Sequence, residues 1–302
     1  MRKVSVIDLG TNTAHLLIAE QIEGGLKVLK KKRHYTFLAE SGIEQITIEA
    51  QNRLFFALAN FDLIVKEFKS PNCVIIGTEA FRIAENGGEI LRNIKQEYGW
   101  DVEIVSGNRE AILIYKGVRQ VVNLTVGNFA IMDIGGGSVE FVISKNGKLE
   151  WKKSFPIGIA KIFNNLFSNN SLTSRDLLKH SKKIRNVFLP LEIALKKYNP
   201  ATLIGAAGSF EILINKTNNS GSQVINKDVF LNKMEEIINL SEEERARVSW
   251  IPEERAKYVT AAILLIRIAL DITNSKKIIV SPFSLKEGLA AEWFEKQKAK
   301  RI

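Results

Sequence analysis

The sequence predicts an α/β protein built from two similar domains. At 302 residues, the chain is long enough for two domains that each bury a substantial core. Short apolar runs of strand length alternate with longer segments in which apolar residues recur at helical spacing. The segment Ile7–Thr13 (IDLGTNT) returns in altered form as Met132–Ser138 (MDIGGGS). Three strands followed by alternating helices and strands, occurring twice, are typical of mixed sheets flanked by helices.

The first half is expected to begin with three strands and to continue with alternating helices and buried strands. Apolar residues at helical spacing predict a helix over residues 47–68. A second helical region is interrupted at Asn86–Gly88, where two glycines follow an asparagine. The other expected elements are strands at 4–8, 14–20, 26–33, 74–76 and 102–105, and helices at 79–98 and 108–121.

The second half restarts the same pattern after residues 123–128. Asn146-Gly147 is a strong hairpin signal between two strands. The expected strands lie at 129–132, 138–143, 149–155, 202–206 and 277–280, and the expected helices lie at 228–239, 241–248, 253–272 and from 285 onward. The predicted domains are therefore residues 1–124 and 125–285, with a terminal helix at about 286–302 that packs back on the first domain.

The two related segments each place an Asp and a small, polar turn between two strands. Glycine leaves no side chain between the backbone and a ligand, and successive exposed N–H groups form an anion-binding concavity. An Asp beside such a turn repels phosphate, so Asp8 and Asp133 indicate a divalent cation, for which Mg²⁺ is suited. Ordinary hairpins whose Asp residues cap their own turns are the alternative. Two copies at matching positions favour phosphate chemistry.

Composition excludes several classes of protein. With 45% apolar and 25% charged residues, the chain resembles soluble globular proteins. No apolar run reaches the roughly 18 residues that a membrane helix needs, because Arg267 interrupts Ala261–Leu270. The N-terminus leads straight into a strand and leaves no room for a secretory signal. Cys73 is the only cysteine, which excludes an intramolecular disulfide and a zinc cluster. These features predict a cytoplasmic protein.

The net charge of +10 predicts attraction to polyanions. The densest basic runs are Lys30–Arg33 and Lys296–Arg301, and such runs are most often a solvated face. No helix-turn-helix, zinc-finger or RNA-binding aromatic signature accompanies the charge, so nucleic acid is not an expected partner. A linear inorganic polyanion would exploit the same field without base contacts. No membrane partner is expected, and a homodimer is left open.

Six ordered motifs resemble a known family. The chain carries IDLGTNT at residues 7–13, GTEAFR at 77–82, SGNREA at 106–111, DIGGGSVE at 133–140, GAAG at 205–208 and SPFSLKEG at 281–288. In order and spacing they resemble the exopolyphosphatase/guanosine pentaphosphate phosphohydrolase family (Ppx/GppA), over nearly the whole chain. The resemblance implies two RNase H-like domains of the actin-like ATPase superfamily, with the active site in the interdomain cleft. It also implies Mg²⁺-dependent hydrolysis of a terminal phosphoanhydride, with Mn²⁺ as an alternative metal.

The chain departs from the family pattern at three places. Longer members carry a helical C-terminal region with an HD-type domain, and this chain is a short two-domain form by that comparison. Members often have an Arg in a strand-end Arg-Leu-Gly segment, where this chain has Phe37–Glu40. Two acidic residues frequently precede the Ala of the third motif, where this chain has Arg109 and Glu110. One carboxylate therefore remains as the candidate base.

The resemblance and the chemistry of the residues together predict the site. Glu110, in the first turn of a helix, is the candidate general base, because hydrolysis needs a carboxylate within reach of the attacking water. The alternative is a glutamate that only complements the helix dipole. His15 occupies the position that matches Glu140, so the two halves are not chemically interchangeable. The predicted catalytic residues are Glu110, Glu140 and Asp133; the metal ligands are Asp133, Glu140 and Asp8; and the phosphate-binding residues are Gly10, Thr11, Asn12, Thr13, Arg82, Gly135, Gly136, Gly137 and Ser138.

The leading hypothesis is an exopolyphosphatase that releases terminal phosphate from inorganic polyphosphate by metal-assisted attack of water. A guanosine pentaphosphate 5′-phosphohydrolase is the first alternative, and the basic surface slightly favours the polymer. An ATP-dependent kinase of the same superfold is a second alternative, because Gly205–Gly208 resembles the adenosine-side loop of such kinases. A catalytically weak protein that binds polyphosphate or an alarmone is the third.

Overall fold

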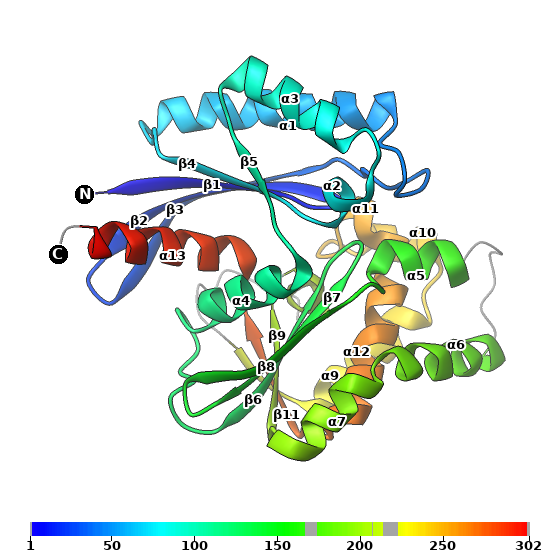
Figure 1. Ribbon diagram of the computed structural model, residues 1–302. Helices are drawn as coiled ribbons and strands as arrows, with labels where there is room; N and C mark the ends of the chain where they lie inside the picture. The colour runs from blue at the N-terminus through cyan, green and yellow to red at the C-terminus, as the bar shows by residue number, and fades with distance from the viewer. Residues whose placement is uncertain (1, 167–173, 207, 214–222, 301–302) are drawn as a thin grey trace. The chain divides into compact units, whose positions relative to one another are not determined.

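The structure, a computed structural model, describes residues 2–166, 174–206, 208–213 and 223–300 (Figure 1). The chain divides into two compact units. Unit 1 consists of Met1–Gln120 together with Leu285–Ile302, and unit 2 consists of Val121–Ser284. The last helix thus belongs to the same unit as the N-terminus, and the chain passes between the units after Gln120 and again after Ser284.

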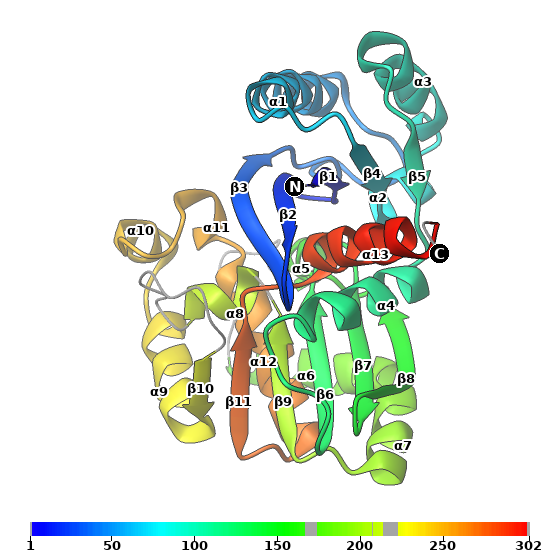
Figure 2. The same ribbon diagram turned by 90° about the vertical axis from the view of Figure 1, so that its left-hand side faces the viewer.

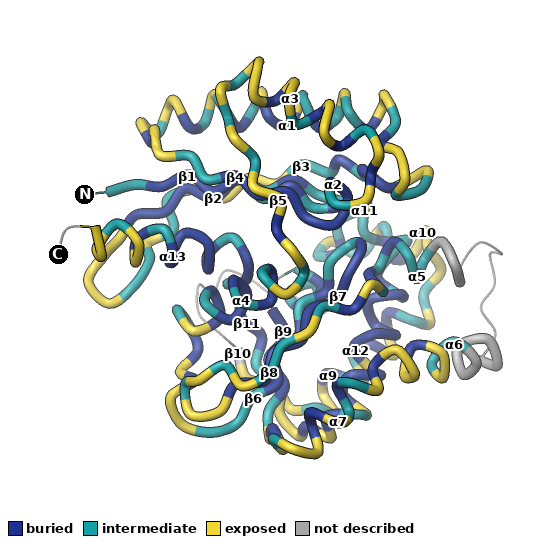
Figure 3. The backbone as a smooth tube through the Cα atoms, viewed as in Figure 1, coloured by how far each residue is buried: buried dark blue, intermediate teal, exposed yellow. Residues whose placement is uncertain are grey.

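A five-stranded mixed sheet forms the centre of unit 1, in the order β3-β2-β1-β4-β5. β2 runs antiparallel to β1 and β3, whereas β4 runs parallel to both β1 and β5. The strands are β1 (Lys3–Leu9), β2 (Thr13–Ile22), β3 (Gly25–Tyr35), β4 (Cys73–Gly77) and β5 (Val102–Ile104). The backbone of β1 and most of β2 is buried, whereas much of β3 is exposed (Figure 3).

Helices cover both faces of this sheet. α1 (Ile48–Glu67) and α3 (Gly87–Tyr98) lie on one face, and α4 (Gly107–Val118) and α13 (Leu285–Ala299) lie on the other (Figure 1). The short helix α2 (Glu79–Ile83) follows β4. α1 confirms the helix predicted over residues 47–68. Thr47 caps this helix by accepting a hydrogen bond from the backbone N–H of Ala50. The apolar stripe of α1 packs on the sheet.

Unit 2 contains a six-stranded mixed sheet in the order β10-β11-β9-β6-β7-β8, and Figure 2 shows the central strands side by side. The strands are β6 (Asn128–Ile134), β7 (Val139–Lys145), β8 (Lys148–Phe155), β9 (Thr202–Ala206), β10 (Gln223–Asn226) and β11 (Lys277–Ser281). The helices are α5 (Ile159–Leu166), α6 (Ser174–Val187), α7 (Leu189–Tyr198), α8 (Gly208–Leu213), α9 (Lys227–Ile238), α10 (Glu242–Arg247), α11 (Glu253–Ala256) and α12 (Val259–Thr273). α12 is buried on nearly every side and packs against α5, α6, α7 and α9.

Two details of unit 2 differ from the sequence prediction. The helix expected over residues 253–272 is divided into α11 and α12. The chain turns at Lys257 and Tyr258, where the backbone N–H of Tyr258 donates to Arg255. β10 was not expected. It is a short edge strand that pairs antiparallel with β11.

The two sheets share one plan. In each unit the first strand is flanked on one side by an antiparallel hairpin and on the other by a parallel strand. The strand pairing shifts at matching places, between Ile18 and Ala19 and between Ile143 and Ser144. These features confirm an α/β fold in which two units, each with a mixed sheet flanked by helices, share one plan. No helix within the described segments has the length and apolar character that would let it cross a membrane.

Candidate active site

The first predicted phosphate-binding turn connects β1 to β2. Gly10 donates its backbone N–H to the carbonyl of Thr13 at 3.0 Å, and a Cβ at residue 10 would lie only 3.0 Å from that oxygen. The segment after β3 then binds the outside of the turn. The N–H groups of residues 36 and 37 donate to the carbonyl of Asn12, and that of residue 38 donates to the carbonyl of Thr11. The turn carbonyls are thereby held by the protein itself.

The second turn connects β6 to β7 and repeats this arrangement. Gly135 donates to the carbonyl of Ser138 at 2.9 Å, and residues 158–160, which follow β8, donate to the carbonyls of Gly135, Gly136 and Gly137. Gly158 lies so close to this turn that an added Cβ would be 2.3 Å from the carbonyl carbon of Gly137. Only glycine permits that approach.

In both turns the carbonyl oxygens accept hydrogen bonds from the segment behind, and the backbone donors remain. Among the described residues, the N–H groups of Thr11, Asn12, Gly136 and Gly137 make no recorded backbone hydrogen bond. Successive N–H groups of this kind form a concavity that favours anions. The geometry of both turns is therefore compatible with the predicted phosphate binding.

Glu110 lies in the first turn of α4, with its side chain almost completely buried at 6% exposure. Ser106 caps the helix by accepting a hydrogen bond from the N–H of Arg109. Burial raises the pKa of Glu110 to about 7, against the lowering effect of Arg82; the nearby carboxylates of Asp8 and Glu79 also raise it. A carboxyl group with a pKa near neutrality can accept and return a proton at physiological pH.

Arg82, on α2, is the immediate partner of Glu110. Its Nη1 donates to Oε1 of Glu110 at 2.6 Å and to the carbonyl of Val105 at 2.5 Å. The sequence predicts a phosphate contact for this arginine, whereas its Nη1 here orients the candidate base. Its Nε and Nη2 make no recorded hydrogen bond within the described part of the chain, so the other edge of the guanidinium can still donate to an anion.

In unit 2, Asp133 and Glu140 lie directly opposite each other on β6 and β7. Glu140 is 3% exposed, and its Oε1 accepts hydrogen bonds from the hydroxyls of Ser138 and Ser154, both at 2.7 Å. Asp133 Oδ2 accepts a hydrogen bond from the hydroxyl of Ser284. The two predicted carboxylates are thus neighbours, and each is oriented by serine hydroxyls.

This donor set fits a magnesium ion. Mg²⁺ is commonly held by one or two carboxylates, with water and phosphate oxygens completing the coordination. Asp133 and Glu140 supply two carboxylates, and serine hydroxyls donate to both of them. Within the described segments no group of three or more His, Cys, Asp and Glu residues has metal-binding geometry. A ligand set made entirely of protein side chains, as zinc prefers, is therefore not present among those residues.

Asp8, the third predicted ligand, occupies the matching position on β1. Its neighbour across the hairpin is His15, where unit 2 has Glu140. His15 Nε2 lies 2.9 Å from the hydroxyl of Thr13. Asp8 belongs to unit 1 together with Glu110, whose pKa its charge raises. That Asp8 holds a metal remains a prediction. Phosphate binding by the adjacent turn Gly10–Thr13 is likewise a prediction.

Comparison with known proteins decides the family. Residues 17–297 match the family model described as the Ppx/GppA phosphatase family. The chain belongs to this family. The resemblance inferred from the six motifs is thereby confirmed, and Ppx/GppA members are phosphohydrolases that act on phosphoanhydride bonds.

Three proteins that are similar to this chain carry two kinds of name. An exopolyphosphatase structure from Cytophaga hutchinsonii is 32% identical, with a TM-score of 0.93 and 98% of each chain covered. A guanosine-5′-triphosphate,3′-diphosphate pyrophosphatase of Vibrio vulnificus is 24% identical over 292 residues, covering 95% of this chain and 58% of the relative. A putative exopolyphosphatase of Haemophilus influenzae is 23% identical, covering 96% of this chain and 90% of the relative. The chain thus spans less than two thirds of the Vibrio protein.

Sequence reasoning assigned no role to three residues that contact or influence the candidate site residues. Ser154 and Ser284 donate to the predicted carboxylates, and Glu79 raises the pKa of Glu110. Ser284 and Glu79 lie inside motifs already recognised, which was a usable signal. Ser154 had no such signal, because an isolated serine on an edge strand reveals its partner only through strand register.

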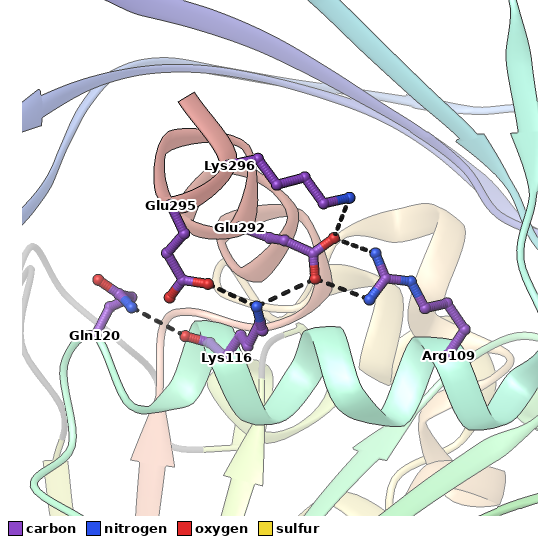
Figure 4. A network of polar contacts seen from close by, with 6 residues as sticks. All are labelled: Arg109, Lys116, Gln120, Glu292, Glu295 and Lys296. Carbon is purple, nitrogen blue, oxygen red and sulfur yellow. Dashed lines mark hydrogen bonds and ion pairs between the residues drawn. The ribbon is translucent and has the colours of Figure 1, made fainter. Parts of the chain in front are cut away.

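A polar cluster links α4, which carries Glu110, to α13 (Figure 4). Glu292 accepts hydrogen bonds from both terminal nitrogens of Arg109 and pairs with Lys116 at 3.2 Å and Lys296 at 2.9 Å. These cations, Arg109 above all, hold the pKa of Glu292 well below its usual range. α4 and α13 approach so closely at Gly288 that an added Cβ there would lie 1.8 Å from the carbonyl oxygen of Leu113. The departure at residue 109 therefore introduces a contact that fixes α4.

Proposed function

We propose that this Ppx/GppA chain hydrolyses the terminal phosphoanhydride bond of a polyphosphorylated substrate, with inorganic polyphosphate as the preferred substrate. The observation that carries the proposal is the buried Glu110, whose pKa of about 7 and position beside Arg82 suit a general base. A base is most effective when its pKa is close to the working pH.

In the proposed reaction, Glu110 accepts a proton from the water that attacks the terminal phosphorus. The bond from that phosphorus to the bridging oxygen breaks, so that phosphate is released and the bridging oxygen leaves with the shortened substrate. The pair with Arg82 fixes the direction of the carboxylate, and the second edge of the guanidinium is available to a phosphate oxygen. Deprotonated Glu110 is stabilised by that arginine, whereas burial opposes the charge. The balance lets the residue take up and release a proton without a large energetic penalty in either state.

Asp133 and Glu140 are proposed to hold Mg²⁺, and Mn²⁺ would suit the same oxygen donors. When bound, the ion supplies neutralisation of phosphate charge. The serines that donate to these carboxylates keep their oxygens oriented. The backbone donors of Gly10–Thr13 and Gly135–Ser138 are proposed to bind phosphate oxygens. Phosphoryl transfer depends chiefly on such positioning and charge neutralisation.

The net charge of +10 favours the polymer, because a basic protein attracts a long polyanion more strongly than a single nucleotide. Hydrolysis of guanosine pentaphosphate is the second candidate, and it is favoured by the name of the Vibrio relative. A kinase is less well supported, because the buried base serves attack by water.

A phosphate-release panel tests the proposal. Purified protein would be given long-chain polyphosphate, guanosine pentaphosphate and ATP, each with and without Mg²⁺. We expect Mg²⁺-dependent release that is fastest with polyphosphate, and a fall of about 10²–10⁴-fold in Glu110→Gln. Glu103→Gln is the matched control, because Glu103 is an exposed glutamate on the neighbouring strand β5. Near-normal turnover in Glu110→Gln would refute the base assignment, and binding without release would favour a binding protein.

A further inference from the structure

The two faces of β3 carry different sets of basic residues. The register places Lys32 opposite Leu16, which packs in the core beneath α1. Because side chains alternate along a strand, Lys31 and Arg33 point to the opposite face. The contact of Lys31 Nζ with Glu287 on α13, at 2.7 Å, confirms this orientation. Arg33 therefore lies on the face that also carries His15, its partner across the strands.

Arg33 is exposed, and its guanidinium packs on an aromatic support formed by Tyr35 and Phe37. Its guanidinium carbon lies 5.1 Å from the centre of the Tyr35 ring, and the Tyr35 and Phe37 rings are stacked with centres 5.6 Å apart and planes at 14°. No carboxylate pairs with Arg33 in the part of the chain that the structure describes. Lys31, two residues away on the same face, is by contrast paired with Glu287.

This support is joined directly to the first phosphate turn. Tyr35 lies opposite Thr13, and Phe37 donates its backbone N–H to the carbonyl of Asn12 at 3.1 Å. Phe37 adopts a left-handed backbone conformation with φ of 45°, which turns the chain back onto the turn. Arg33 comes two residues before Tyr35 on β3, so it lies about 7 Å further from the turn. The turn and the guanidinium are thus held in a fixed relation within unit 1.

We propose that this face of β3 is a second phosphate subsite, in which Arg33 contacts phosphoryl groups further along a linear polyphosphate whose end lies at Gly10–Thr13. The inference rests on the proposed function and deepens it by naming the substrate class. A guanidinium donates two parallel hydrogen bonds to a phosphate, and one without a carboxylate partner loses no ion pair in doing so. Arg33 supplies such a cation near the end of β3, just ahead of the segment that binds the first phosphate turn.

The same geometry favours a polymer over a nucleoside. The Tyr35 ring already contacts the Arg33 guanidinium and stacks on the Phe37 ring, so a nucleobase would have to compete with these contacts to stack on it. The subsite is therefore suited to phosphate oxygens, which approach the outer edge of the guanidinium.

Direct binding tests the subsite without relying on hydrolysis. The dissociation constant of long-chain polyphosphate would be measured by titration calorimetry on the full chain, in EDTA to prevent turnover. We expect Arg33→Gln to weaken binding about tenfold, in line with loss of a charge-assisted hydrogen bond. Lys32→Gln is the matched control, because it removes the same charge from the adjacent residue on the opposite face; its effect should stay under about twofold. Arg33→Lys should fall between them, since it keeps the charge and loses the planar fork.

The outcomes separate this inference from the proposed function. Equal weakening in Arg33→Gln and Lys32→Gln would mean non-specific attraction, and no weakening in either would remove Arg33 from the binding surface; both overturn the subsite. Absence of phosphate release from the wild type would overturn the proposed function while leaving the binding result valid. In active protein, the KM of Arg33→Gln should rise more for long polyphosphate than for guanosine pentaphosphate. An equal rise would overturn the assignment to the polymer.

Discussion

The two Gly-containing turns have nearly the same backbone and different side-chain chemistry. Gly10 bonds to Thr13 at 3.0 Å and Gly135 bonds to Ser138 at 2.9 Å, and each turn is held from behind by the segment after the third strand. At the matched position of the following strand, His15 bonds to a threonine hydroxyl, whereas Glu140 accepts from two serines.

This difference shows how a duplicated fold can acquire distinct halves. In both units the turn presents backbone N–H groups that we propose bind phosphate, and that feature depends only on turn geometry. Unit 2 adds a pair of neighbouring carboxylates that fits a metal ion. Unit 1 has His15 in place of a carboxylate at the matched position on β2, but it presents Glu110 from α4. The predicted division of labour is a metal-holding turn in one unit and a proton-accepting helix in the other.

The largest expected effect comes from replacing the two matched residues, Glu140 and His15, separately by glutamine. Glu140→Gln removes a proposed metal ligand and should lower Mg²⁺-dependent phosphate release by about 10²–10³-fold. His15→Gln should lower it less than about tenfold, because it alters the contact with the Thr13 hydroxyl but removes no proposed metal ligand. Initial rates over a Mg²⁺ titration measure both. Equal losses in the two variants would mean that the halves play equivalent roles.

Gly158→Ala tests how tightly the second turn is held. The new methyl group would overlap the backbone of Gly137, so we expect the free energy of unfolding to fall by about 1–3 kcal/mol or more. Gly88→Ala is the control, since its Cβ would meet only the end of the Arg92 side chain at 3.8 Å, on the first turn of α3. Thermal melts of both variants make the comparison. A Gly158→Ala protein as stable as Gly88→Ala would mean that the loop behind the turn moves freely.

The α4–α13 contact should contribute to the stability of unit 1. Arg109→Met leaves the nearly buried carboxylate of Glu292 without its bidentate partner, and we expect a loss of about 1–3 kcal/mol. Lys116 and Lys296 still contact Glu292, which limits the loss. The pKa of Glu292 is lowered in the folded protein, so this stabilisation is present above the ordinary carboxyl pKa and is lost as the pH falls below it. Denaturant titrations at pH 7 and pH 3.5 should show a difference between wild type and Arg109→Met that shrinks at the lower pH; a constant difference would contradict this origin.

The smallest expected effect is a shift in a pH profile. The charge of Glu79 raises the pKa of Glu110, so Glu79→Gln should move the acid limb of kcat/KM to lower pH, by less than about one unit. Glu85→Gln, which changes an exposed glutamate just beyond α2, should leave the limb in place. A shift to higher pH in Glu79→Gln would show that this glutamate influences Glu110 through structure and not through its charge.

The sequence alone predicted much of the fold because its signals are local. The duplicated Asp-Gly turns, the apolar spacing of α1 and the Asn146-Gly147 hairpin can each be recognised within a short window. The unpredicted contacts join distant residues. Ser284 reaches Asp133 across 151 residues, and Arg109 reaches Glu292 across 183. Nothing local to Arg109 indicates its partner, and the pairing of Arg82 with Glu110 likewise depends on how α2 and α4 pack.

The pH dependence of kcat/KM for phosphate release from long-chain polyphosphate shows whether Glu110 is the general base. With Mg²⁺ held constant, we expect activity to fall on the acid side with a midpoint near pH 7, as Glu110 becomes protonated. This limb should be absent from the residual activity of Glu110→Gln. A profile that is flat from pH 5 to pH 8, or an acid limb that persists unchanged in Glu110→Gln, would contradict the assignment of Glu110 as the base.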